Sequence, residues 1–156
     1  MTTVRIGGAS GYWGESDMAL PQLLRAGDLD FIVFDYLAEI TMSIMARAKA
    51  KDPSKGFASD FVTDVLRPNL GEIDRQSVRI IANAGGVNPV ACGEAVRQAV
   101  AEAGLSLRVA VITGDDLLDQ AEALVRKGHR EMFSGQPMPA GERLASINAY
   151  LGAVPI

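Results

Sequence analysis

The sequence predicts an α/β fold with a mostly parallel sheet and flanking helices. Four apolar runs, at residues 4–6, 31–34, 78–82 and 109–112, each lead into a glycine-bearing or acidic turn and then into a helix-like pattern. A strand-then-helix order that repeats along a chain is typical of parallel sheets. Four such units favour a Rossmann-like, doubly wound open sheet, and a partial β/α barrel is the alternative.

Length and composition indicate one α/β domain over residues 1–156. The chain is 48% hydrophobic and 22% charged, which is ordinary for a globular domain. Its net charge of -4 and its scattered basic residues argue against nucleic acid as a partner. No apolar segment approaches the roughly 18 residues that cross a bilayer, and no secretory signal is recognisable, so we expect no membrane partner and a cytoplasmic location. The lone Cys92 falls on an apolar helical stripe, which predicts a buried, inert thiol.

The first half of the chain contains three helical patterns. The first begins near Ser16 or Asp17, either of which can cap exposed amides, and ends at Gly27. The second follows the run at 31–34 and ends at the Asp-Pro pair at 52–53. The third, with apolar residues between 61 and 66, is expected to end before Pro68, because the residue before a proline disfavours helical geometry.

The second half continues the same order. Asn88-Pro89 opens a helix that ends at Gly104, since asparagine suits a cap and proline suits the first turn. A fourth strand at about 107–112 and a helix ending before Gly128 follow. A long loop from 129 to 141 then precedes a short predicted helix at 143–151. Because a parallel sheet needs cover on its faces and edges, we expect further units or another chain to supply it.

The turns after the strands carry the candidate site, because ligands of parallel α/β sheets bind beyond the carboxyl ends of the strands. The first turn has glycines at 7, 8, 11 and 14, whose amides could approach an anionic group at a helix N-terminus. Tyr12 and Trp13 lie within this turn, and exposed aromatic residues favour binding. The alternative is that the glycines only permit a tight strand-to-helix connection.

The second turn places Asp35, Tyr36 and Glu39 within one helical turn of each other. Carboxylates so spaced could act as acid and base, bind a divalent cation or accept hydrogen bonds from hydroxyl groups. We predict Asp35, Glu39 and Tyr36 as the catalytic candidates. The alternative is helix capping, with both carboxylates near the positive end of the helix dipole.

The third and fourth turns supply further polar groups. Gly85 and Gly86 lie between Asn83 and Asn88, and their amides and side chains could hold an oxyanion or carboxylate. Residues 113–116 read Thr-Gly-Asp-Asp, and Asp115 joins the candidate ligand-binding residues. Capping of the next helix explains this turn equally. No metal ligand is assigned.

Three long motifs, at residues 5–14, 30–39 and 81–89, together with residues 149–153, make the chain resemble the N-terminal part of the acyclic terpene utilisation protein A (AtuA) family, a domain of unknown function. The resemblance implies a longer family architecture and a role in the catabolism of citronellol and geraniol through acyl-coenzyme A intermediates. It also adds weight to these candidate residues of the first three turns: Gly7, Gly8, Ser10, Gly11, Asp35, Tyr36, Glu39, Asn83, Gly85, Gly86 and Asn88. Trp13 is a further ligand-binding candidate, from its place in the first turn.

The leading hypothesis is therefore a family member that binds or transforms an anionic small molecule, a carboxylate or acyl-CoA, at the glycine turns. The second is a non-catalytic assembly subunit, a homo-oligomer or a chain that packs on a complementary one. The third is a metal-dependent hydrolase or lyase that uses the acidic residues of the turns. The cofactor is unknown.

Overall fold

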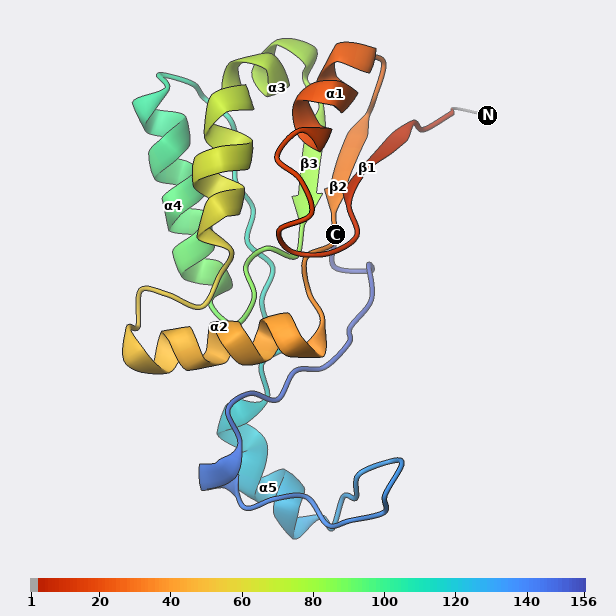
Figure 1. Ribbon diagram of the computed structural model, residues 1–156, viewed down its shortest axis with the longest axis vertical. Helices are drawn as coiled ribbons and strands as arrows, with labels where there is room; N and C mark the ends of the chain where they lie inside the picture. The colour runs from red at the N-terminus through yellow and green to blue at the C-terminus, as the bar shows by residue number, and fades with distance from the viewer. Residues whose placement is uncertain (1–2) are drawn as a thin grey trace. The chain divides into compact units, whose positions relative to one another are not determined.

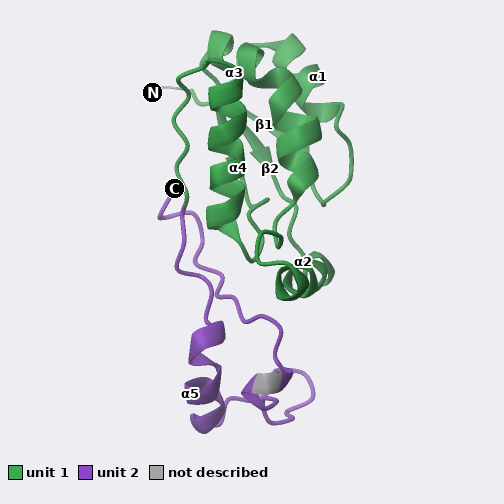
Figure 2. Cartoon of the chain, turned by 90° about the vertical axis from the view of Figure 1, so that its left-hand side faces the viewer, with its two compact units in different colours: residues 1–111 green, residues 112–156 purple. Residues whose placement is uncertain are grey.

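The computed structural model describes residues 3–156, except for the side chain of residue 142. It contains two compact units, Met1–Val111 and Ile112–Ile156, which are described separately (Figure 2). Among the described residues, no helix is long and apolar enough to cross a membrane.

The first unit is built on an open, three-stranded parallel sheet, which confirms the predicted fold class. Strands β1 (Ile6–Ser10), β2 (Phe31–Phe34) and β3 (Arg79–Ala82) lie in the order β1-β2-β3. Phe31 of β2 pairs with Ile6 on one side and with Arg79 on the other. The register of β1 shifts between Gly8 and Ser10, so a bulge bends the end of this strand where the first turn begins.

Helical segments connect the strands. They are α1 (Ala19–Ala26), α2 (Glu39–Lys51), a π-helical stretch η1 (Phe61–Leu66), a 3-10 turn η2 (Arg67–Asn69), α3 (Leu70–Gln76) and α4 (Pro89–Glu102). Gly27 and Gly104 follow α1 and α4 with φ of 71° and 69°, which confirms both predicted helix ends. Pro89 is the first residue of α4, as predicted.

The three described strands follow one another without the reversal of order that makes a sheet doubly wound. Right-handed connections that advance in one direction place their helices on one face. Figures 1 and 2 show α1, α3 and α4 gathered on one side of the strands, with α2 crosswise at their carboxyl ends. We call the other side the outer sheet face. Its residues, from the strand register, are Ile6, Gly8, Phe31, Val33, Arg79 and Ile81.

The core lies between the sheet and its helices. Ile32 and Phe34 of β2 are fully buried and pack with Leu20 of α1 and Met45 of α2. A second layer comes from the helical stretch after residue 60, where four apolar side chains are buried. Burial of these apolar side chains is the main contribution to the stability of the unit.

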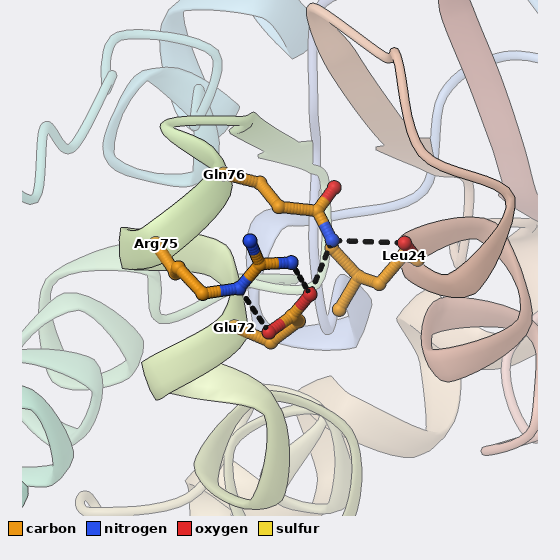
Figure 3. Close-up of polar contacts among 4 residues, drawn as sticks. All are labelled: Leu24, Glu72, Arg75 and Gln76. Atoms are coloured by element: carbon orange, nitrogen blue, oxygen red, sulfur yellow. Dashed lines mark hydrogen bonds and ion pairs between the residues drawn. The ribbon is translucent and has the colours of Figure 1, made fainter.

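A polar contact joins α1 to α3 at the edge of the core (Figure 3). The Gln76 side-chain amide donates to the Leu24 carbonyl at 2.8 Å and also to Glu72. Arg75 donates to the other Glu72 oxygen at 2.8 Å. These hydrogen bonds lower the pKa of Glu72 to about 2, because they stabilise its charged form. The contact satisfies a carbonyl in the last turn of α1, which has no partner within the helix.

The predicted helix end before Pro68 is wrong. The chain continues without a break through η2 into α3, and Pro68 lies in the first turn of the 3-10 segment. A proline there costs little, because the first turn of a helix needs no N–H donor. The side-chain amide of Asn69 donates to the Val65 carbonyl at 2.8 Å, so this acceptor near the proline has a hydrogen-bond partner.

The predicted fourth strand at 107–112 is also not formed. The segment is extended, and Leu107 and Val109 pack against the core. The segment instead runs alongside α4, since Val111 contacts Gly93 and the Arg97 guanidinium donates to the Val109 carbonyl at 3.4 Å. A strand needs a neighbour's backbone, and among the described residues no backbone hydrogen bond joins residues 106–112 to a neighbouring strand.

The second unit contains η3 (Leu118–Gln120), α5 (Ala121–Arg126) and η4 (Gly141–Arg143). Residues 144–151, predicted as part of a helix, are not helical. Instead the Leu117 amide donates to the Ile147 carbonyl and the Ala149 amide to the Asp115 carbonyl, both at 2.8 Å. These antiparallel contacts around the Asp116–Asn148 bridge take the backbone groups that a helix would have used.

Candidate functional site

The first three turns meet at the carboxyl-end edge of the sheet. The Asp35 amide donates to the Ser10 carbonyl at 3.2 Å, which joins the first turn to the second. Asn83 joins the third turn to the second, because its Nδ2 donates to Asp35 Oδ1 and its Oδ1 accepts from the Tyr36 amide, both at 2.7 Å. The sequence predicts that all four turns share this edge, and these contacts join the first three of them. The fourth turn belongs to the second unit.

A pocket of about 380 Å³ opens beside these turns, and we call it the strand-end pocket. Its volume is at the lower end of the range of roughly 300–1,000 Å³ that is usual for small-molecule sites. Its wall combines the loop before α1, Tyr36, which lies two residues after the end of β2, and residues of η1 together with Asp60, which precedes it. The lining residues are Gly14, Glu15, Ser16, Asp17, Tyr36, Asp60, Asp64 and Val65.

Tyr36 is the most buried of the candidate catalytic residues. It is 3% exposed, and its ring makes edge-to-face contacts with Phe34 and Phe61 at centroid distances of 5.9 and 5.7 Å. Burial, and then the nearby Asp60 carboxylate, raise the pKa of Tyr36 to about 12, because both disfavour a phenolate. The side chain therefore presents a neutral phenol to the pocket.

The raised pKa of Tyr36 predicts a loss of stability at alkaline pH. Since the folded state holds the phenol proton more tightly than the unfolded state, this contribution is complete below pH 10 and is lost as the pH rises to about 12. We expect roughly 2 kcal/mol of unfolding free energy to disappear across this range. Urea denaturation at several pH values checks it, and Tyr36→Phe should flatten the decline.

The control for this titration is Cys92, which is 7% exposed, as predicted for a buried thiol. Burial raises the pKa of Cys92 to about 11, so its ionisation also destabilises the fold above pH 9. This contribution is common to the wild type and Tyr36→Phe and cancels in their difference. Equal pH slopes for the two proteins would show that Tyr36 does not titrate as described.

Trp13 contacts the wall of the pocket through Asp60. Its indole Nε1 donates to Asp60 Oδ1 at 2.8 Å, and its ring packs against the core. The residue predicted as an exposed aromatic is thus half-buried, whereas its neighbour Tyr12 is 59% exposed. A hydrogen bond of this kind holds the loop before α1 against η1.

The amide of Gly11 already carries a carboxylate. Glu15 Oε2 accepts from it at 2.6 Å, so an internal side chain occupies the position that the first turn offers to an anion. One residue earlier, the Ser10 hydroxyl is buried and has no hydrogen-bond partner in the described part of the chain. A buried polar atom without a partner costs about 1–3 kcal/mol, so Ser10 is suited to contact a water or a ligand atom.

The other candidates of the first two turns lie outside the pocket wall. Asp35 and Glu39 are exposed, with Asp35 bound to Asn83 and Glu39 in the first turn of α2. Gly7 is buried, and a Cβ there would come within 2.9 Å of Leu29, which explains this glycine by packing. Gly8 is exposed and lies on the outer sheet face.

The third turn is shaped by close packing. A Cβ at Gly85 would lie 2.9 Å from Pro89, and one at Gly86 would lie 2.7 Å from the Gly56 carbonyl. The side-chain amide of Asn88 donates to the backbone carbonyls of residues 53 and 55 at 2.9 and 2.7 Å. This side chain makes no capping hydrogen bond to α4. These contacts account for the three residues without a ligand.

Asp115 and Asp116 belong to the second unit. Asp115 Oδ2 accepts from Asn148 Nδ2 at 2.9 Å, and Asp116 Oδ1 accepts from the Leu118 amide at 2.9 Å. The second contact is the local capping that the sequence offered as an alternative. Within residues 3–156 as described, no three His, Cys, Asp or Glu side chains are grouped so that they could hold a metal ion.

Asp60 and Asp64 were not recognised as site residues from the sequence. They lie four residues apart at the start of a helical segment, where two like charges repel each other. That unfavourable spacing on an otherwise apolar segment is the signal that could have identified them. Glu15 was not recognised because nothing local indicates that it bends back to Gly11.

The fold and the site define an open parallel α/β protein with an acidic pocket at the carboxyl ends of its strands. The model of the acyclic terpene utilisation family protein AtuA matches residues 4–156, so the chain belongs to this family. No curated protein and no solved structure is significantly similar to it.

Proposed function

We propose that this chain serves acyclic terpene utilisation by binding a small terpenoid molecule in the strand-end pocket. Family membership supports the pathway, and the meeting of three turns beside a pocket of about 380 Å³ supports the place. A ten-carbon terpenoid such as citronellol or geraniol suits this volume, whereas coenzyme A is much larger and would extend outside it. A cytoplasmic location belongs to the same proposal.

Filling the pocket tests this proposal. Ser16 lines the pocket and is exposed, so Ser16→Phe adds a ring there. It also removes the hydrogen bond that Ser16 Oγ accepts from the Met18 amide at 3.1 Å, so circular dichroism must first verify that the variant is folded. We expect it to lower citronellol affinity at least tenfold in calorimetry. The control is Ser106→Phe, at an exposed serine of the same unit that does not line the pocket. Equal affinities of both variants and the wild type would place any binding elsewhere.

The second candidate ligand is an anionic molecule, a carboxylate or acyl-CoA, as expected from the glycine turn. The Glu15 carboxylate on the Gly11 amide favours it, because a ligand carboxylate could replace that side chain. In this case Glu15→Ala should increase the affinity for citronellate or an acyl-CoA, whereas weaker or unchanged binding contradicts the idea. Asp35 and Glu39 stay predictions as acid and base, and so does a metal-dependent reaction.

The second class of function is assembly, and the outer sheet face favours it. Ile6 is 63% exposed there, and Phe31, Val33 and Ile81 are half-buried. An uncovered face of a parallel sheet is unusual, because both faces are normally covered. Light scattering of the purified chain tests the idea: a homo-oligomer that Ile6→Lys dissociates supports it, and a monomer opposes it.

A further inference from the structure

The Tyr36 hydroxyl is the first of two observations that indicate the chemistry of the ligand. Tyr36 is only 3% exposed, yet it forms part of the wall of the strand-end pocket. No hydrogen bond of its hydroxyl is found among the residues that the structure describes. The hydroxyl is open to the pocket, since Ser10 Oγ is the one unpartnered side-chain atom that is fully enclosed in the described residues, so a ligand in the pocket can supply its partner.

The second observation is the negative charge of the side chains around it. Four carboxylates line the pocket, from Glu15, Asp17, Asp60 and Asp64, and none of the lining residues is basic. Ionised carboxylates only accept hydrogen bonds. Asp60 uses one oxygen for Trp13 Nε1 and keeps further lone pairs free. A ligand group placed here therefore meets four carboxylates, the Ser16 hydroxyl and one phenol.

We propose that the ligand enters this pocket with a hydrogen-bond donor, an ammonium or hydroxyl group, directed at Tyr36 and Asp60, and that the pocket selects against a carboxylate at the same end of the molecule. This inference rests on the proposed function, since it names the ligand class for the same pocket. The negative potential of the four carboxylates attracts a cation, leaves an alcohol unaffected and repels an anion.

A matched set of three molecules separates these cases. Geranylamine, geraniol and geranate share one ten-carbon skeleton and differ only in the charge of the terminal group. At pH 7.5 we expect the amine to bind at least tenfold more tightly than the carboxylate, with the alcohol between them. Trp13 is the chain's single tryptophan and contacts the pocket through Asp60, so its fluorescence reports binding, and calorimetry measures the affinity.

Two variants locate the donor. Tyr36→Phe keeps the ring contacts and removes the hydroxyl, so we expect amine and alcohol affinities to fall about fivefold, the effect of one hydrogen bond. Asp60→Asn keeps an acceptor oxygen for Trp13 and removes the charge, so it should weaken the amine more than the alcohol. The matched control is Tyr150→Phe, because Tyr150 is 95% exposed and outside the pocket. Circular dichroism verifies that each variant is folded.

Each outcome decides between the two proposals. If none of the three molecules binds the wild type, the proposed function fails and this inference fails with it. If they bind but geranate equals or exceeds geranylamine, the pocket is a ligand site and this inference alone is overturned. The same holds if folded Tyr36→Phe and Asp60→Asn bind the amine as tightly as the wild type does.

Discussion

Replacing Gly86 with alanine is expected to lower the free energy of unfolding by about 3 kcal/mol. Gly86 has φ of 53°, a backbone conformation that costs other residues about 1–2 kcal/mol. A Cβ there would also overlap the Met45 sulfur and come within 2.7 Å of the Gly56 carbonyl. Met45 is 1% exposed and Gly56 contributes backbone, so neither can move away cheaply. Urea denaturation followed by circular dichroism measures the loss.

Gly104→Ala separates the two causes in this experiment. Gly104 has φ of 69°, but nothing lies within 4 Å of the position that its Cβ would take. It should therefore lose only the backbone part, about 1 kcal/mol. If Gly86→Ala is no more destabilising than Gly104→Ala, close packing does not explain the glycine, and a ligand role for Gly86 regains support.

Replacing Phe34 with alanine is expected to cost about 3–5 kcal/mol, a large part of the 5–15 kcal/mol that stabilises a typical domain. Phe34 is 2% exposed, and its ring meets Tyr36 and Phe61 edge to face at 5.9 and 5.3 Å. Its removal leaves a cavity and deletes both aromatic contacts. Thermal and urea unfolding of the variant measure the effect.

The control for the core is Phe133→Ala, since Phe133 is 88% exposed. A surface substitution of this kind should stay within about 0.5 kcal/mol of the wild type. Because Phe34 supports Tyr36 from behind, a folded Phe34→Leu variant should also bind pocket ligands less well. A loss of under 1 kcal/mol for Phe34→Ala would contradict the description of the core.

Much of the fold could be predicted because its signals are local. The apolar runs that became β2 and β3, the glycines at 27 and 104 and the proline at 89 each act on their own neighbourhood. The run at 4–6 overlaps β1 only at Ile6, because β1 continues through Gly7 and Gly8, which the sequence predicts as part of the first turn. The parallel arrangement then follows from the repeated order of strand and helix. The meeting of the first three turns could be predicted too, since parallel strands end at one edge.

The errors come from segments whose backbone partners are distant in the sequence. The extended segment after α4 alternates as a strand does, but no neighbouring strand's backbone pairs with it in the described part of the chain. Residues 144–151 have helical spacing, but their backbone bonds to residues 115–117. Local patterns report which side of a segment is buried and say nothing about which backbone group will be its partner.

The sequence by itself determined β2 and β3, most helix ends, the fold class and the family to which the chain belongs. Only the tertiary structure decided the wall of the pocket, where Tyr36 meets Asp60 and Glu15 folds back to Gly11. The reason is physical: secondary structure depends on preferences within a few residues, whereas a pocket depends on side chains that packing brings together from separate segments. Asp60 lies 47 residues from Trp13 along the chain and 2.8 Å from it in space.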